Sequence, residues 1–235
     1  MRTLAVVPVK TFDIAKQRLA RTLARGSRES LAQAMFADVL AALRRARRID
    51  AIAVVTCDAT ADSLARGMAT VLRDRAQAGQ SAAAEIGIEN AVREGFDRVL
   101  LVPGDTPLVD AHELDVLLER VAADRLAVAI VGDRHGTGTN ALVLSPPDAI
   151  KPSFGPDSLA RHTAAAEAAG LPHRVEDVPS LAHDVDTPED LAALAALFTE
   201  TRLGAARTRG ALRQLERSGS APAATAGSGS AAHQG

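Results

Sequence analysis

Apolar runs and helical patterns alternate along this chain, with short loops rich in glycine, aspartate and proline between them. Four runs are short, continuously apolar and rich in β-branched residues, which is typical of strands covered on both faces. They span residues 4–9, 51–56, 99–102 and 126–131, and apolar residues at helical spacing occupy 30–44, 81–93 and 110–121. This alternation predicts an α/β domain with a mostly parallel sheet flanked by helices. Its ligand site is expected at the carboxyl ends of the strands.

Composition restricts the possible partners. The 235 residues are 47% apolar, which is enough for one sizeable core. They are 24% charged with a net charge of -2, so the chain lacks the charge excess of a protein that binds nucleic acid or a membrane surface. Trp and Tyr are missing, which disfavours base recognition by aromatic stacking. Cys57 stands alone and no window approaches the roughly 20 apolar residues of a membrane span. We therefore expect a cytoplasmic protein that binds neither nucleic acid nor membrane.

The end of the chain changes character at about residue 201. Arginine and alanine come first, then serine, glycine, alanine and proline with almost no large apolar side chains. Such a composition does not offset the entropy lost on ordering. We expect one folded domain over residues 1–200 and a disordered, solvated tail over 201–235, with a helix only at its start.

The first loop that carries candidate chemistry follows the first predicted strand. It places Lys10, Lys16 and Arg18 together in the first turn of an α/β sheet, where cations suit a polyphosphate. A solvated basic loop is the alternative, since lysine and arginine are common on any surface. The loop lacks the Gly-x-x-x-x-Gly-Lys-Ser/Thr pattern, so a P-loop kinase is not supported.

Two later loops carry carboxylates that could bind a metal ion. Asp105, after Gly104, lies in the loop that follows the third predicted strand and can hold a hard divalent cation such as Mg2+, although aspartate there also fits an ordinary turn. Asp184 and Asp186 are spaced by two, so an extended backbone points both to one side, where they could complete the metal site. The residues after them need no functional role, because Thr187 fits a helix N-cap followed by proline.

Two loops rich in glycine, small hydroxyls and cations lie between residues 132 and 162. Glycine lets backbone amides approach an anion, and a helix N-terminus favours negative charge. The glycines are Gly136, Gly138 and Gly155, the hydroxyls Thr137, Thr139 and Ser158, and the spare cations Arg134, Arg161 and His162. A plain flexible loop has a similar composition, but two such clusters favour the binding of a phosphorylated acid. His135 and His162 are expected to be ordinary polar residues, because neither has a partner at metal-ligand spacing.

Five motifs together resemble one known family. They are VPVK with AKQRL at 7–10 and 15–19, GDTPL at 104–108, GTGTN at 136–140, FGPDS at 154–158 and DVDTPEDL at 184–191. In content and order they are similar to the guanylyltransferases of coenzyme F420 biosynthesis, the CofC or FbiD family. The last motif is shared with other nucleotidyltransferases and therefore indicates the fold more than the substrate.

The resemblance covers roughly residues 1–200. It implies a single-domain, Rossmann-like (GT-A-like) nucleotidyltransferase that transfers GMP from GTP to the phosphate of a three-carbon acid and releases pyrophosphate. The acid is phosphoenolpyruvate, which we favour, 2-phospho-L-lactate or 3-phospho-D-glycerate. The product would pass to the next enzyme of coenzyme F420 biosynthesis, and a homodimer stays open because no surface stands out as an interface.

The resemblance also implies roles for individual residues. The acid would be held at Thr139, Gly155 and Ser158. Gln80 and Ser81 would contact the nucleobase, beside the phosphate contacts expected of Lys10 and Lys16. Independently of the family, a transfer between two anions needs charge neutralisation, which Mg2+ on Asp105 and Asp186 together with Lys16 and Arg18 could supply. Lys16, Arg18 and Asp105 are therefore the expected catalytic residues. A cytidylyl- or uridylyltransferase acting on a sugar or polyol phosphate, and a non-catalytic nucleotide-binding domain, remain as alternatives.

Overall fold

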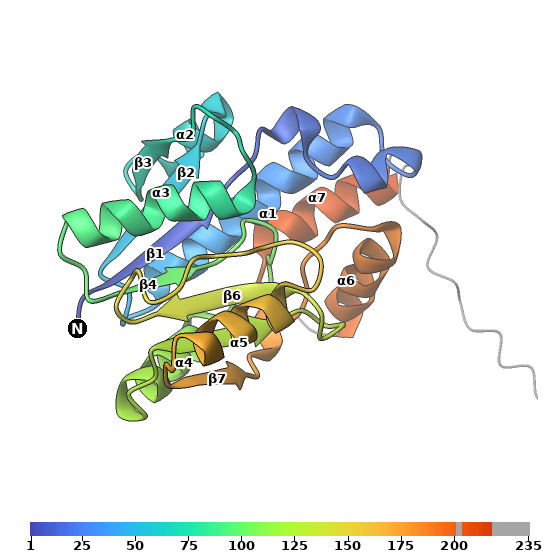
Figure 1. Cartoon of the computed structure of the whole chain (residues 1–235). Helices are drawn as coiled ribbons and strands as arrows, with labels where there is room; N and C mark the ends of the chain where they lie inside the picture. Colours follow the sequence, from blue (N-terminus) through green and yellow to red (C-terminus); the bar gives the residue numbers. More distant parts are fainter. Residues whose placement is uncertain (201–203, 218–235) are drawn as a thin grey trace, which may run out of the picture.

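The computed structural model of the chain describes residues 1–200 and 204–217 (Figure 1). Its centre is a seven-stranded sheet in the order β3-β2-β1-β4-β6-β5-β7. The strands are β1 Thr3–Pro8, β2 Ala51–Thr56, β3 Thr70–Arg73, β4 Arg98–Leu101, β5 Val128–Gly132, β6 Thr139–Leu144 and β7 His173–Glu176. Only β6 runs antiparallel to its neighbours, β4 and β5, so the predicted mostly parallel sheet is confirmed.

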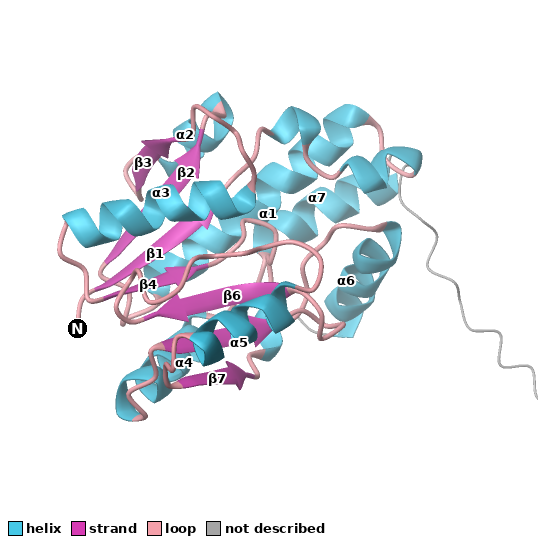
Figure 2. Cartoon of the chain, in the orientation of Figure 1, coloured by secondary structure: helices cyan, strands magenta, loops and turns pink. Residues whose placement is uncertain are grey.

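Helices cover both faces of this sheet (Figure 2). The α-helices are α1 Arg25–Arg45, α2 Ala59–Ala65, α3 Gln80–Arg93, α4 Ala111–Ala123, α5 Ser158–Ala168, α6 Pro188–Glu200 and α7 Ala206–Arg217. Three short 3-10 helices are η1 Phe12–Ile14, η2 Gln17–Arg21 and η3 Pro179–Leu181. None of the helices in the described ranges is both long enough and apolar enough to cross a bilayer.

Alternation along the strands explains the two layers of the core. Ala5 and Val7 of β1 pack on one face with α1, α2 and α4, whereas Leu4 and Val6 pack on the other with α3 and α5, because successive strand side chains point to opposite faces. Helix α3 lies very close to β1, where a Cβ added at Gly87 would come within 2.2 Å of Val6 Cγ1. Only glycine permits this approach.

A third apolar cluster corrects the expectation of a solvated tail from residue 201. Leu212 and Leu215 of α7 are buried together with residues of η2, α1 and α6. The buried Asp38 carboxylate of α1 accepts hydrogen bonds from the Thr208 amide and hydroxyl, each at 2.8 Å. Composition alone was misleading because two well-placed leucines bury one side of an arginine-rich helix. The rest of the expected tail, residues 201–203 and 218–235, lies outside the described residues.

Three strands differ from the sequence-based expectation. β3 and β7 are short edge strands with few apolar residues, and β6 begins at Thr139, inside the segment expected to be a glycine-rich loop. Thr139 and Asn140 are therefore strand residues. They are buried between β4 and β5, and this neighbourhood, rather than local composition, makes the segment a strand.

Candidate active site

A cavity of about 810 Å³ opens at the edge of the sheet where β1 and β4 end. Its walls come from the β1–η1 loop, the turn after β4, the start of α3, the β5–β6 connection, the loop before α5 and the segment before α6. The position is that expected for a ligand site in an open α/β sheet, and the volume falls in the range of small-molecule sites. Every loop expected to carry chemistry thus contributes to one cavity.

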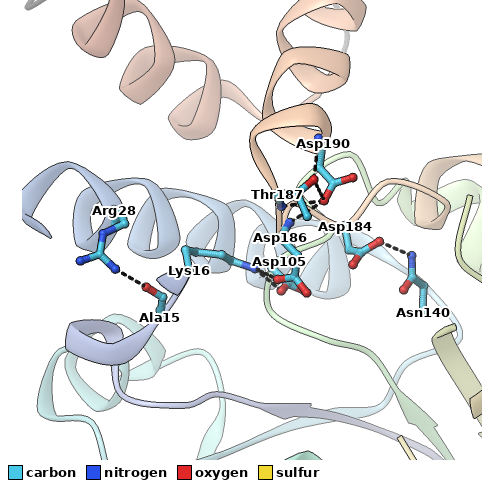
Figure 3. A network of polar contacts seen from close by, with 9 residues as sticks. All are labelled: Ala15, Lys16, Arg28, Asp105, Asn140, Asp184, Asp186, Thr187 and Asp190. Carbon is cyan, nitrogen blue, oxygen red and sulfur yellow. Dashed lines mark hydrogen bonds and ion pairs between the residues drawn. The ribbon is translucent and has the colours of Figure 1, made fainter. Parts of the chain in front are cut away.

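Lys16 joins the two carboxylates expected to bind metal. Its Nζ donates to Asp105 and to Asp186 Oδ1, the latter at 2.9 Å (Figure 3). Only 6% of the Lys16 side chain is exposed. Burial lowers the pKa of the ammonium, but the two carboxylates outweigh it and raise the pKa from 10.5 to about 12. Lys16 adopts a left-handed backbone conformation (φ 56°), a strain that is common at functional sites.

The start of α6 fixes Asp186. Thr187 caps the helix, as predicted, because its hydroxyl accepts from the Asp190 amide at 3.2 Å. The Asp190 carboxylate reaches back to the amides of Asp186, at 3.0 Å, and Thr187, at 2.7 Å, which is the reciprocal pattern of a capping box. Arg134 also pairs with Asp190. Sequence reasoning gave Asp190 only a structural role, yet it holds the backbone of a site carboxylate.

Asp184 lies beside this pair and is held by Asn140. The Asn140 amide donates to Asp184 at 3.2 Å and to the Leu181 carbonyl at 2.8 Å. Burial raises the pKa of Asp184 from 3.8 to about 6. The charge of Asp105, and less strongly that of Asp186, adds to the rise, while the Asn140 hydrogen bond opposes it. Three carboxylates therefore share one strongly negative region, which the Lys16 ammonium partly neutralises.

The donor set of Asp105 and Asp186 fits a divalent cation. Two carboxylate oxygens already converge on one positive group, the Lys16 ammonium. Mg2+ is usually held by one or two carboxylates, with waters and substrate phosphates completing its shell. Within residues 1–200 and 204–217, no cluster of three or more His, Cys, Asp or Glu side chains is arranged to hold a metal ion. The residues that would hold the cation are Asp105 and Asp186.

The expected acid-binding residues form another wall of the cavity. Thr139 opens β6, Ser158 opens α5, and Gly155 lies in the preceding loop with φ +113°, a conformation that favours glycine. The Leu159 amide donates to the Thr137 carbonyl at 3.1 Å and so joins the two glycine-containing loops. The two loops expected to bind the anion, about twenty residues apart in the sequence, therefore lie against each other.

The expected nucleotide-binding residues separate into two groups. Lys10, Lys16 and Gln80 line the cavity, as does Arg18, which was expected to be catalytic, and Lys10 and Arg18 are exposed. Ser81 does not line it, and its hydroxyl accepts a hydrogen bond from the Phe154 amide at 2.8 Å. The structure thus gives Ser81 a visible role in anchoring the loop before α5, and its role toward a nucleobase stays a prediction.

The three residues expected to be spare cations are all engaged. Arg134 pairs with Asp190, and Arg161 Nε donates to Ser153 Oγ at 2.8 Å. His162 is completely buried, and burial, aided by the charge of Arg161, lowers its pKa to about 4. His162 is therefore neutral near pH 7, and the expectation of a spare cation was wrong because sequence does not reveal burial.

The cavity, its carboxylates and its cationic loop define a nucleotidyltransferase built on a mostly parallel α/β sheet. A solved structure of a candidate nucleotide-diphospho-sugar transferase from Desulfovibrio desulfuricans G20 has the same fold, with a TM-score of 0.74 at 18% identity over 92% of this chain and 96% of that one. The model of the family described as "Guanylyl transferase CofC like" matches residues 3–215. The chain belongs to this family of guanylyltransferases, as its motifs predicted.

Two relatives illustrate the family. The phosphoenolpyruvate guanylyltransferase of Conexibacter woesei is 51% identical over 218 residues, which cover 92% of this chain and 98% of the relative. The 2-phospho-L-lactate guanylyltransferase of Methanothermobacter thermautotrophicus is 34% identical over 195 residues, which cover 83% of this chain and 84% of the relative. Two acid substrates are therefore named among the relatives of this chain.

Proposed function

We propose that this protein transfers GMP from GTP to the phosphate of phosphoenolpyruvate and releases pyrophosphate, in coenzyme F420 biosynthesis. The observation that carries the proposal is the convergence of Asp105, Asp186 and Lys16 at the sheet edge, in the same cavity as Thr139 and Ser158. Such a site supplies a cation-binding pair of carboxylates for a triphosphate and hydroxyls for a second, smaller anion.

The transfer needs no general base. A phosphate monoester has a second pKa near 6, so the acid phosphate is largely a dianion at pH 7. One of its oxygens forms a bond to the α-phosphorus of GTP while the bond from that phosphorus to the β-phosphate oxygen breaks. Pyrophosphate leaves with the electron pair, and no proton has to move. The protein therefore contributes alignment and charge neutralisation.

Each part of the cavity has a task in this reaction. Lys10, Lys16 and Arg18 neutralise the triphosphate, and Gln80 contacts the base from the start of α3, while Ser81 beside it holds the loop before α5. Thr139, Gly155 and Ser158 hold the acid. Mg2+, carried by Asp105 and Asp186, supplies charge stabilisation for the phosphates when it is bound.

Phosphoenolpyruvate is the proposed acid because the relative that shares 51% identity is named for it. The relative at 34% identity is named for 2-phospho-L-lactate, which makes this acid the second candidate, ahead of 3-phospho-D-glycerate. A homodimer, delivery of the product to the next enzyme of the route, and a cytoplasmic location stay predictions.

The test is to incubate the protein with GTP, Mg2+ and each of the three acids separately and to follow pyrophosphate. We expect release with phosphoenolpyruvate, and with GTP but not with CTP or UTP. Consumption of CTP or UTP with a sugar or polyol phosphate would point instead to the cytidylyl- or uridylyltransferase alternative. Saturable GTP binding without pyrophosphate release in any mixture would indicate a non-catalytic domain.

A further inference from the structure

A buried histidine supports the wall of the cavity that carries Thr139. His162 lies on α5 with no exposed surface. Its Nε2 is 2.8 Å from the Ser153 amide nitrogen, and its Nδ1 is 3.0 Å from the Thr139 hydroxyl oxygen. The ring also meets Phe154 edge-on, with centroids 5.2 Å apart and planes at 73°. Three contacts from two segments therefore fix both the position and the rotation of the imidazole.

The hydrogen-bond pattern determines which ring nitrogen carries the proton. The Ser153 amide can only donate, so Nε2 must accept and carries no hydrogen. The ring is neutral near pH 7, because burial and the neighbouring Arg161 lower its pKa to about 4. A neutral imidazole has one N–H, which must then be at Nδ1. Nδ1–H consequently donates to the Thr139 hydroxyl oxygen.

This assignment decides what Thr139 offers to the cavity. A hydroxyl that accepts from the histidine keeps its own hydrogen for another acceptor. Among the described residues His162 is the only partner recorded for Thr139 Oγ1, and Thr139 lines the cavity. In the opposite tautomer the hydroxyl would donate to Nδ1 and turn only lone pairs to a ligand, which would repel an anion.

We propose that His162 is a positioning residue which, through its Nδ1–H, holds the Thr139 hydroxyl as a hydrogen-bond donor to the anionic acid substrate. The inference rests on the proposed function, because it assigns the acid to this wall. His162 itself touches neither substrate and acts by orienting Thr139, which does. The same ring holds the Ser153 amide, so it also steadies the loop that leads to Gly155.

Two amide substitutions separate the functions of the two ring nitrogens. In His162→Asn the amide nitrogen falls near the place of Nδ1 and keeps a donor for Thr139. In His162→Gln the amide lies near the place of Nε2, which keeps a partner for Ser153 but loses that donor. We expect His162→Gln to raise KM for the acid roughly 10- to 100-fold, as for loss of a hydrogen bond to a charged group, with KM for GTP unchanged.

Further variants complete the kinetic test. His162→Asn should stay nearer to the unsubstituted protein than His162→Gln. His112→Gln, the same change at an exposed position on α4, should leave both KM values unchanged. In a Thr139→Val background His162→Gln should add less than about a twofold effect, because coupled residues are not additive. Equal multiplication of KM in both backgrounds, or an unchanged KM for the acid in His162→Gln, would overturn the inference.

A spectroscopic measurement keeps the inference testable even if a variant folds poorly. Long-range 15N–1H correlation spectra of the labelled, unsubstituted protein report which ring nitrogen of His162 is protonated. We expect a protonated Nδ1 and a bare Nε2, and the reverse assignment would refute the inference. Failure of the proposed function is recognised separately, since the unsubstituted protein would then release no pyrophosphate with any of the three acids.

Discussion

Replacing Lys16 by methionine should strengthen the binding of a divalent cation in the absence of nucleotide. The Lys16 ammonium contacts both Asp105 and Asp186, so a metal ion that uses both carboxylates has to displace it. Methionine removes the charge and keeps an unbranched, flexible side chain that can fill the buried space. The two carboxylates are then free to accept the cation.

The size of the effect follows from the pKa of Lys16. It is raised from 10.5 to about 12 even though burial alone lowers it. One pKa unit corresponds to about 1.4 kcal/mol, so the site favours the ammonium over the neutral amine by about 2 kcal/mol. If displacement costs the same amount, Lys16→Met should bind the cation roughly 30-fold more tightly.

Calorimetric titration of the nucleotide-free protein with Mg2+ or Mn2+ measures this change. Lys10→Met is the matched control, because Lys10 lines the same cavity but is exposed, and its affinity should stay that of the unsubstituted protein. Turnover of Lys16→Met should fall although the metal binds better, since the triphosphate loses a cation. Equal or weaker metal affinity in a Lys16→Met protein of normal thermal stability would refute the reasoning.

Three further predictions concern the site and the core. Asp105→Asn should lower pyrophosphate release by roughly 10²- to 10³-fold, about 3 to 4 kcal/mol of transition-state stabilisation, with the fold intact. Near-normal turnover would remove Asp105 from the site. The depressed pKa of His162, about 4 against 6.5 when unfolded, means that the unfolded chain binds the extra proton first. The contribution of His162 to the free energy of unfolding should therefore be fully present above about pH 6.5 and should fall by on the order of 3 kcal/mol as the pH drops toward 4. Urea titrations at a series of pH values measure this change, and a His162→Asn protein should lack it. Gly87→Ala should destabilise the fold by about 1 to 3 kcal/mol through overpacking against Val6, as measured by thermal melts. The control Gly26→Ala lies at an exposed helical position with open space around it and should be neutral or stabilising.

Local pattern predicted much of the fold because the central strands are buried on both faces. β1, β2 and β4 each contain an unbroken apolar run, and α1, α3 and α4 repeat apolar residues at helical spacing. Edge strands β3 and β7 carry few such residues and were missed. β6 was missed for a different reason, since its first residues follow a glycine-rich turn and become a strand only by pairing with β4 and β5.

The same contrast applies to α7. Its arginine-rich composition indicated a solvated segment, yet Leu212 and Leu215 are buried, and Thr208 binds Asp38 of α1. Most helical stability in proteins comes from packing of an apolar side against the rest of the molecule. A surface created by α1 and α6 cannot be read from the composition of α7 itself.

The amino-acid sequence by itself determined the kinds of chemical group at this site and the loops that carry them, because the ends of parallel strands necessarily meet at one edge of a sheet. Only the tertiary structure decided which groups pair. Lys16 meets Asp105 and Asp186 across 89 and 170 residues of chain, and His162 is neutral because the folded structure buries it. Charge, protonation and hydrogen-bond direction depend on the neighbouring groups and on the exclusion of water. Neighbouring groups and dry surroundings exist only once the chain has folded.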